Sequence, residues 1–200
     1  MSGESQAGRS RPARPTAGTA RAGRPPIATR RLLLRDLCAE DRLPLERLAR
    51  EPRVLAHVPA PTRALAATQR APARGLAARR TRRRAYEFAV VRRRGGKLIG
   101  VCDLALTGPR HADIGYLLLP RHWGYGYATE LARALIDFGF RDLGLRALTA
   151  VVAVENERSR RVLDKAGLRW DGLIRRHTRF AGRWHDCHRY LIERSRWDGV

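Results

Sequence analysis

The stretch HADIGYLLLP RHWGYGYATE LARALIDFGF RDLGLRALTA VVAVEN, His111–Asn156, decides the fold. It opens with an apolar run of strand length, Ile114–Leu119, which ends at Pro120. An amphipathic helix follows, and then a second apolar strand, Ala147–Val154. The order strand, turn, helix, strand predicts a βαβ unit whose helix N-terminus can hold a phosphate group.

The turn before this helix contains two glycines, Gly124 and Gly126. Without Cβ atoms, successive backbone N–H groups can approach an anion, and the positive end of the helix faces the same point. Arg121 can add a charge-assisted hydrogen bond. The stretch lacks the Gly-Lys-Ser/Thr of a Walker loop, and Thr129 replaces the third glycine of a dinucleotide fingerprint. A glycine-rich turn without a ligand is the alternative interpretation.

Arg121-x-x-Gly124-x-Gly126 resembles the Arg/Gln-x-x-Gly-x-Gly/Ala signature of the GNAT acyltransferases. The surroundings are similar to the branch that contains the ribosomal-protein N-terminal acetyltransferases RimJ and RimL. The similar segments follow the family's order from about residue 27 to 194: Thr29-x-Arg31-Leu32-x-Leu34-Arg35, Ile114-Gly115-Tyr116, Trp123-Gly124-x-Gly126-Tyr127-Ala128-Thr129-Glu130, Asn156-x-x-Ser159, Lys165-Ala166-Gly167-Leu168 and Gly182-x-x-x-Asp186. So many landmarks in one order favour an acyl-CoA enzyme over a ligand-free turn.

The resemblance implies acetyl-CoA as the cofactor and implies its position. The pantetheine arm is expected beside Leu117–Leu119, where this strand separates from Ala147–Val154, and backbone N–H groups near Leu118 and Leu119 are expected to bind the thioester oxygen. The turn is expected to hold the diphosphate. The expected cofactor-binding residues are Leu117, Leu118, Leu119, Arg121, His122, Trp123, Gly124, Tyr125, Gly126, Tyr127, Ala128, Asn156 and Ser159.

Attack of an amine on a thioester needs alignment, donors for the developing oxyanion and a proton for the departing thiolate. The resemblance places Ser159 near the sulfur as that proton donor, helped by positioning or by a water chain because serine is a weak acid. It places Asn156 against the pantetheine. A plain helix N-cap and an ordinary first-turn serine are the alternatives for these two residues.

The general base stays open among several candidates. RimL-like enzymes carry a carboxylate on the strand after Gly167, where this chain has Thr178 beside His177. An imidazole can accept a proton near neutral pH, whereas a carboxylate must first be desolvated. The candidates are Asp113, Glu87, His177 or a water relayed from one of them.

A protein N-terminal α-amine is the expected acceptor, and a small-molecule amine or an aminoglycoside is the alternative. A polycationic drug should prefer an acidic mouth, whereas this chain is basic. A third alternative is an RNA- or ribosome-associated binding protein with a degenerate acyl-CoA site. Pro61–Arg84 favours it, with eight arginines and no acidic residue, although a solvated helix explains this segment equally well. A homodimer is an open alternative to a monomer.

The chain has 200 residues and a formal net charge of +22. Its only lysines are Lys97 and Lys165, so arginine carries nearly all of the positive charge. Together with abundant Ala, Gly and Pro, this indicates either GC-rich coding or selection for a basic surface. There is no apolar run of the roughly 18 residues that a membrane span requires, and no signal peptide is apparent. A cytoplasmic enzyme without membrane contact is expected.

Cysteine and histidine spacing gives little support for disulfides or metal sites. Cys38, Cys102 and Cys187 are scattered, and their odd number argues against a disulfide framework. His185, Cys187 and His188 suggest a metal cluster, but alternation along a strand sends His188 to the opposite face. No metal is therefore expected. Asp186 is interpreted as a structural acceptor for a neighbouring loop.

Residues 1–26 lack periodicity and predict a disordered tail, whose arginines offer a second route to RNA contact. Residues 27–200 are predicted to form one domain: an α+β fold with a mixed, mostly antiparallel twisted sheet flanked by helices and a splayed central strand pair. The predicted elements are a strand at Ile27–Leu34, a helix from Glu40, a hairpin of Tyr86–Arg92 with Leu98–Leu106, a strand at His111–Leu119, the central helix, the strand Ala147–Val154, a short helix between Asn156 and Gly167, and a hairpin of Leu168–Arg176 with Trp184–Ile192.

Overall fold

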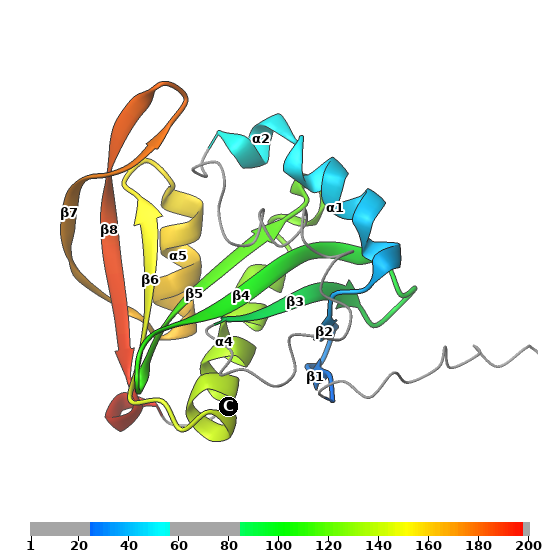
Figure 1. Ribbon diagram of the computed structural model, residues 1–200, viewed down its shortest axis with the longest axis horizontal. Helices are drawn as coiled ribbons and strands as arrows, with labels where there is room; N and C mark the ends of the chain where they lie inside the picture. Colours follow the sequence, from blue (N-terminus) through cyan, green and yellow to red (C-terminus); the bar gives the residue numbers. More distant parts are fainter. Residues whose placement is uncertain (1–24, 57–84, 198–200) are drawn as a thin grey trace, which may run out of the picture.

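The computed structural model describes residues 25–56 and 85–197, and their elements belong to one sheet with flanking helices (Figure 1). In chain order the elements are β1 (Ile27–Ala28), β2 (Leu32–Asp36), α1 (Arg42–Ala49), α2 (Pro52–Leu55), β3 (Ala85–Arg92), β4 (Leu98–Gly108), β5 (His111–Leu118), α4 (Tyr127–Asp137), β6 (Ala147–Ala153), α5 (Glu157–Ala166), β7 (Arg169–Phe180) and β8 (Arg183–Glu193). Short 3₁₀ turns cover Ala39–Asp41, Pro120–His122 and Arg194–Arg196, and a π-helical turn, Phe138–Asp142, extends α4.

The eight strands follow the order β1-β2-β3-β4-β5-β6-β8-β7. Neighbouring strands pair antiparallel, except β5 and β6, which run parallel. The parallel pairing extends only from His111 with Ala147 to Asp113 with Thr149. β5 continues to Leu118 away from β6, so the sheet opens between these strands. The mixed sheet and its splayed central pair are confirmed.

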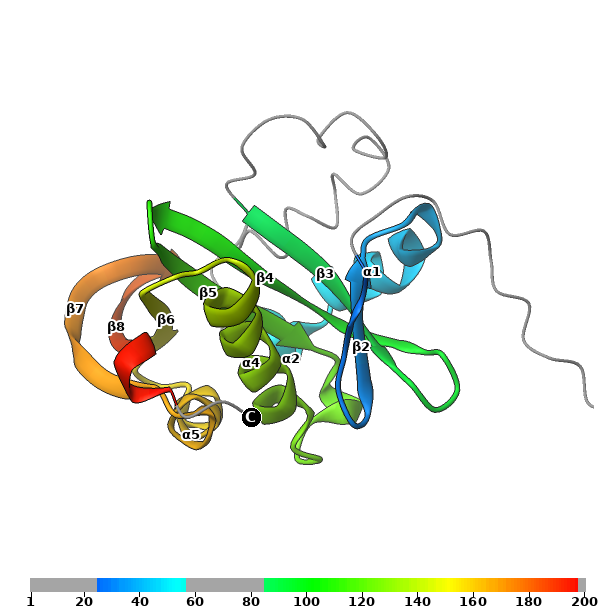
Figure 2. The ribbon, with the colours of Figure 1, turned by 90° about the horizontal axis from the view of Figure 1, so that it is seen from below.

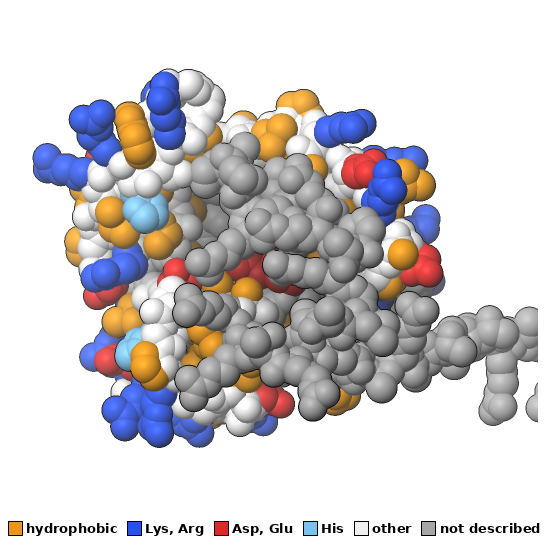
Figure 3. Space-filling view, in the orientation of Figure 1, with side chains coloured by type: hydrophobic (Ala, Val, Ile, Leu, Met, Phe, Trp, Pro, Cys, Tyr) orange, Lys and Arg blue, Asp and Glu red, His pale blue; other side chains and the backbone are white. Residues whose placement is uncertain are grey.

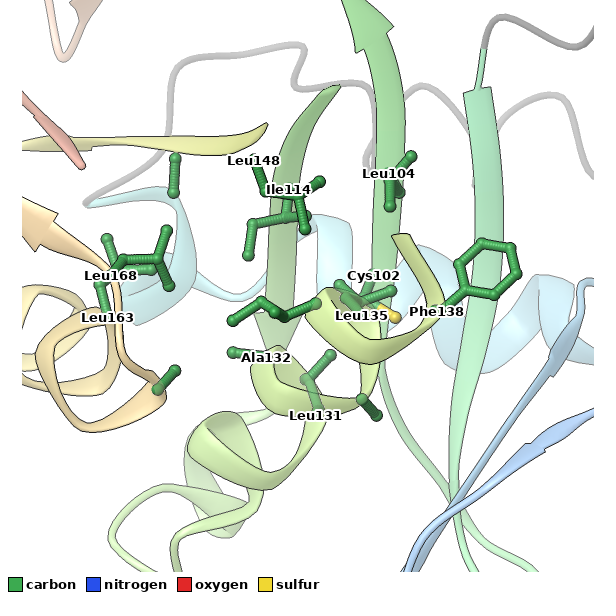
Figure 4. Packing of buried hydrophobic residues seen from close by; sticks show 14 of the residues in the cluster. Cys102, Leu104, Ile114, Leu131, Ala132, Leu135, Phe138, Leu148, Leu163 and Leu168 are labelled. Atoms are coloured by element: carbon green, nitrogen blue, oxygen red, sulfur yellow. The ribbon is translucent and has the colours of Figure 1, made fainter. Parts of the chain in front are cut away.

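Helices cover the two faces of the sheet separately, with α4 and α5 on one face and α1 and α2 on the other (Figures 1 and 2). Apolar side chains recur along one side of α4, as the sequence predicted. Leu131 and Leu135 point from this helix toward sheet residues such as Cys102 and Ile114 (Figure 4). This core fixes α4 against β5, and with it the turn that joins them.

The prediction of one strand over Ile27–Leu34 is wrong, because the chain reverses between β1 and β2. The Thr29 N–H donates to the Leu32 carbonyl at 2.9 Å, and the Arg31 N–H donates to Glu130 Oε1 at 2.7 Å. A turn replaces the strand centre because a carboxylate from α4 binds it, a contact that strand periodicity cannot reveal.

Two predicted segments lie largely or wholly outside the described residues: the tail 1–26, of which only Pro25 and Pro26 are described, and the arginine-rich segment Pro61–Arg84. The other predicted helices and hairpins are confirmed within a few residues of their bounds. Across the described part of the chain, no helix combines the length and the hydrophobicity required to cross a bilayer.

Gly100 allows β4 and β5 to approach each other directly beside the open seam. A Cβ at this position would lie 2.1 Å from the Leu117 carbonyl oxygen and 3.0 Å from the Leu118 Cα. We therefore expect Gly100→Ala to lower the free energy of unfolding by about 1–3 kcal/mol in urea denaturation. Gly108→Ala on the same strand is the matched control, because its Cβ would meet only His111 side-chain atoms at 3.7 Å or more. Equal stability of the two variants would contradict the close approach.

Candidate functional site

A pocket of about 610 Å³ opens at the C-terminal end of β5. Its walls come from α2, the end of β5, the turn before α4, the start of α4 and one side of α5. Its charged lining residues are Arg53, Arg158, Arg161 and Lys165, and the described residues that line it include no carboxylate. A pocket with this lining suits a polyanion.

The glycine turn forms one wall of this pocket. Gly124 and Gly126 have φ angles of +82° and +76°, values that side chains rarely adopt. A Cβ at Gly124 would meet nothing within 4 Å, so the space beside it is open to a ligand. The helix α4 then begins at Tyr127, and no side chain caps its first N–H groups. Uncapped N–H groups beside a cationic pocket are the arrangement that a phosphate group requires.

Glu130 ties this turn to the β1–β2 connection. Its carboxylate accepts hydrogen bonds from Thr29 Oγ1 at 2.6 Å, from the Arg31 N–H at 2.7 Å and from Arg31 Nε at 2.6 Å. The Arg31 guanidinium also donates to the Tyr125 carbonyl at 2.9 Å and lies over the Tyr127 ring. Burial would raise the pKa of Glu130, but the hydrogen bonds from Thr29 and Arg31 outweigh it, and the pKa is lowered. An anionic Glu130 therefore holds the turn through Arg31.

Of the two predicted oxyanion donors at the end of β5, the Leu118 N–H is available to a ligand and the Leu119 N–H is not. The Leu119 N–H donates to the Ile99 carbonyl at 2.9 Å, so the expectation that Leu119 binds the thioester oxygen is wrong. Because N–H directions alternate along an antiparallel strand, the Leu118 N–H faces away from β4, toward the open seam. Trp123 Nε1–H donates to the Leu118 carbonyl at 2.7 Å and fixes the orientation of the next peptide, between Leu118 and Leu119.

The start of α5 lies across the pocket from this strand. Asn156 Oδ1 accepts the Ser159 N–H at 3.1 Å, so Asn156 caps the helix, and both residues line the pocket. The Ser159 hydroxyl lies 2.7 Å from the Tyr116 hydroxyl. The sequence analysis did not assign Tyr116 a role. The sequence feature that could have pointed to Tyr116 is its hydroxyl group within the apolar run Ile114–Leu119.

Most of the expected cofactor residues line the pocket. They are Leu117, Leu118, His122, Trp123, Gly124, Gly126, Tyr127, Ala128, Asn156 and Ser159. Leu119, Arg121 and Tyr125 are not part of its lining. Arg121 is exposed and donates through Nε to His122 Nε2 at 3.2 Å, while Tyr125 contributes its carbonyl to Arg31. The structure thus gives Arg121 no place in the pocket wall.

The candidate bases lie away from the pocket. Asp113 accepts a hydrogen bond from Thr149 Oγ1 and stands five residues before Leu118, about 17 Å along the strand. This separation rules out direct proton transfer from an amine held at Leu118. Glu87 lies on β3, and His177 is exposed on the edge strand β7. None of these three candidates is among the residues that line the pocket.

The sequence analysis missed a buried carboxylate, Asp103 on β4, opposite Gly115. It lies in register with Glu87, and its neighbours in sequence, Cys102 and Leu104, face the main core. By strand alternation Asp103 therefore faces the side of α1 and α2, and the same reasoning places Glu87 and Asp113 there. A charged residue inside the apolar run Leu98–Leu106 was the available signal.

Three polar residues of β8, His185, Asp186 and His188, have structural partners. Asp186 Oδ1 accepts the Arg176 N–H at 2.7 Å, so it is a structural acceptor as predicted, but the donor lies at an irregularity within β7 and not in a loop. His185 contacts Glu155 through Nδ1 at 3.1 Å, whereas His188 Nδ1 accepts from Trp170 Nε1 at 2.8 Å. Among the described residues, no group of three or more His, Cys, Asp or Glu side chains could hold a metal ion.

The splayed parallel pair, the uncapped helix after a glycine turn and the cationic pocket together define an acyl-CoA-binding class of α/β fold. A sequence profile described as an acetyltransferase (GNAT) domain matches residues 31–169. This match covers more than half of the chain, which therefore belongs to the GNAT acetyltransferase family. The predicted family is confirmed, and its members use acetyl-CoA.

Individual relatives agree with this assignment. Uncharacterized N-acetyltransferase YoaA of Bacillus subtilis is 34% identical over 116 residues, 57% of this chain and 66% of that protein. The match thus spans just under two thirds of this relative. RimJ of Mycobacterium smegmatis, in complex with CoA-disulfide, has a TM-score of 0.72 and 24% identity, covering 84% of this chain and 85% of that one. Spermidine N-acetyltransferase of Vibrio cholerae, in complex with CoA and spermine, has a TM-score of 0.70 and 23% identity, covering 82% and 96%. At these identities the two structures establish the fold.

Gly124→Val tests the phosphate turn. A β-branched side chain would enter the open space beside the turn, so we expect the dissociation constant for coenzyme A to rise at least about 100-fold in calorimetry. Gly144→Val is the matched control, because Gly144 also has a positive φ (+64°) and open space around it but lies outside the pocket lining. Both variants should lose similar stability. Unchanged coenzyme affinity in Gly124→Val would exclude this turn as the phosphate site.

Glu130→Gln tests the tie between Glu130 and Arg31. Without its charge the turn is less preorganised, so we expect about tenfold weaker coenzyme A binding and a loss of about 1–3 kcal/mol in unfolding free energy. Because the pKa of Glu130 is lowered below 4.5, its stabilisation is present above that value and is lost as the pH falls through the folded-state pKa. The variant should lack this acid-dependent part of the stability curve.

Glu46→Gln provides the control for this measurement. Glu46 pairs with Arg42 on the exposed side of α1, at 2.9 Å, and such pairs contribute less than about 1 kcal/mol. Coenzyme affinity should not change. Equal effects of the two substitutions would show that the Glu130 contact does not organise the turn.

Proposed function

We propose that this chain transfers the acetyl group of acetyl-CoA to a primary amine by direct attack. The observation that carries the proposal is a single continuous arrangement: the uncapped start of α4, the cationic pocket beside it, and the Leu118 N–H on the open side of β5 in a pocket that the Ser159 side chain also lines. The first two parts suit the phosphates of coenzyme A. The third offers a donor for an oxyanion and a donor for a sulfur, the two needs of thioester aminolysis.

Each part of the chain has a defined task in this reaction. Acetyl-CoA supplies an activated acetyl group when bound. The N–H groups at Gly124–Tyr127 bind its diphosphate, with Arg158, Arg161 and Lys165 adding positive charge. The Leu118 N–H donates to the carbonyl oxygen as negative charge develops there. Ser159 donates a hydrogen bond to the departing sulfur.

A protein N-terminal α-amine is our preferred acceptor. Support comes from the sequence landmarks of the RimJ/RimL-like branch and from the fold similarity to RimJ of Mycobacterium smegmatis. The pocket also meets α2 at Arg53 and Val54, so an acceptor can approach from the side of α1 and α2. An extended peptide terminus is narrow enough to enter a seam between two strands.

A small polyamine is the second candidate acceptor, and one observation favours it. By strand alternation, Glu87, Asp103 and Asp113 lie on the sheet face that α1 and α2 cover, and carboxylates attract cationic amines. In the orientation of Figure 1, some acidic side chains lie near the middle of the molecule and others lie around its periphery, where the visible basic side chains lie (Figure 3). The spermidine N-acetyltransferase of Vibrio cholerae, whose fold is similar, has been crystallised with CoA and spermine.

The arginine-rich segment that favoured RNA binding lies outside the described residues. The described site has the open glycine turn, the uncapped helix and the Ser159 hydroxyl that acyl transfer needs. We therefore propose an active rather than a degenerate acyl-CoA site.

Mass spectrometry tests the reaction and the acceptor together. The protein is incubated with acetyl-CoA and with peptides bearing free N-termini, the same peptides with blocked N-termini, and spermidine. We expect the mass gain of one acetyl group on the free peptides, absence of transfer to the blocked ones, and loss of transfer in Gly124→Val. Acetylation of spermidine alone would establish the second candidate. No acetylated product from any amine would refute the proposed activity.

A further inference from the structure

The hydroxyl groups of Tyr116 and Ser159 lie within hydrogen-bond distance of each other in the pocket. Tyr116 OH and Ser159 Oγ are 2.7 Å apart, although they are separated by 43 positions in sequence. Both side chains line the pocket. The proposed reaction uses Ser159 and leaves Tyr116 unexplained.

Both partners of this pair are held by rigid elements. Tyr116 lies three residues beyond Asp113, the last residue of β5 that pairs with β6, and its backbone remains in register with Cys102 of β4. Ser159 lies in the first turn of α5, where Asn156 caps its N–H. The distance between the hydroxyls is thus set by the sheet and by the helix cap rather than by a mobile loop.

Hydrogen-bond counting favours one direction for this contact. A serine hydroxyl has one hydrogen and two acceptor lone pairs. If Ser159 donated its hydrogen to Tyr116, none would be left for the sulfur. Burial raises the pKa of Tyr116 to about 12, against the smaller opposing effect of its hydrogen bond with Ser159. The phenol therefore keeps its hydrogen at neutral and mildly alkaline pH and is able to donate it.

We propose that Tyr116 is a positioning residue of the acetyl-transfer site: its O–H donates to Ser159 Oγ and leaves the single Ser159 hydrogen directed at the sulfur of the coenzyme. This proposal rests on the proposed function. A donated hydrogen bond also polarises the serine hydroxyl and makes it a better donor. Tyr116 thereby supports a group that is otherwise a weak acid.

The protons balance with acetyl-CoA, the amine and water as the participants. The amine nitrogen forms a C–N bond with the acetyl carbonyl carbon. The C–S bond breaks, and the electron pair of that bond stays on the sulfur. The sulfur takes the proton of the Ser159 hydroxyl, and Ser159 regains one from water, which accepts the proton released by the amine. Tyr116 retains its own proton throughout.

Kinetics of single and double variants test the positioning role. Tyr116→Phe should lower kcat about tenfold while the KM for acetyl-CoA stays within about twofold, since one neutral hydrogen bond is lost. Ser159→Ala should lower kcat further. The double variant should be no slower than Ser159→Ala, because the two hydroxyls act as a unit. Additive losses, or an unchanged kcat in Tyr116→Phe, would overturn the proposal.

A titration of bound coenzyme A provides a readout that does not need an acceptor. A hydrogen bond from Ser159 stabilises the thiolate, so the pKa of the bound thiol, followed by thiolate absorbance, should lie below that of free coenzyme A. Tyr116→Phe should raise it by up to about one unit, and Ser159→Ala should raise it at least as much. Equal thiol pKa values in the unmodified protein and in Tyr116→Phe would refute the positioning role.

Tyr190→Phe is the matched control, because Tyr190 is a buried tyrosine of β8 outside the pocket lining. It should change neither kcat nor the thiol pKa.

Failure of the proposed function is distinguishable from failure of this inference. A protein that binds coenzyme A and shows the Tyr116-dependent thiol shift, but acetylates no amine, would retain the positioning contact and lose the activity. A protein that does not bind coenzyme A would overturn both.

Discussion

The site depends on the loss of pairing between β5 and β6 after Asp113. In a fully paired sheet the N–H groups of both strands would be consumed by ladder hydrogen bonds. Divergence frees the side of β5 that faces away from β4, and the pairing of β5 with β4 keeps the freed strand straight. The core beneath α4 stabilises this arrangement, because Leu131 and Leu135 belong to the same buried cluster as Ile114 and Leu118 of β5. The pocket is thus a consequence of strand geometry. The backbone creates the space, and the side chains around it determine its shape and charge.

The arginines near the site fall into two groups, one paired with a carboxylate and one stacked on an aromatic ring. Arg31 is committed to Glu130 and to the Tyr125 carbonyl, so it shapes the turn rather than waiting for a ligand. Arg53 and Arg158 lie over the Trp123 ring at 5.2 and 5.5 Å and also line the pocket. Stacking on an indole limits the directions that a guanidinium can take without neutralising it. The overall charge therefore does not indicate which arginines can bind a ligand at the site, whereas the contacts of each arginine do.

Much of the fold could be predicted from the sequence, because strand and helix periods and the caps Asn156 and Gly167 are local signals. The glycine turn was predictable for the same reason. Three features depend on contacts between distant residues and were not predicted: the reversal at Thr29–Arg31, the pairing of Tyr116 with Ser159, and the use of the Leu119 N–H by Ile99. Asp103 was missed because a buried charge in an apolar run contradicts the hydrophobic pattern that predicts the strand.

One consequence concerns how the chain can vary in length. The Leu118 carbonyl is held by Trp123, which lies within the connection between β5 and α4, and the Tyr125 carbonyl is held by Arg31 from outside it, so hydrogen bonds fix both ends of this connection. An inserted or deleted residue in this connection would move one anchor away from its partner and rotate the start of α4 relative to the open strand. At the tip of the β3–β4 hairpin, Gly95 and Gly96 have open space around them, and the described anchors of this hairpin, the bonds from Arg93 to the Arg31 and Thr29 carbonyls, lie before the tip. Natural length variation should therefore concentrate at hairpin tips of this kind and spare the connection to α4.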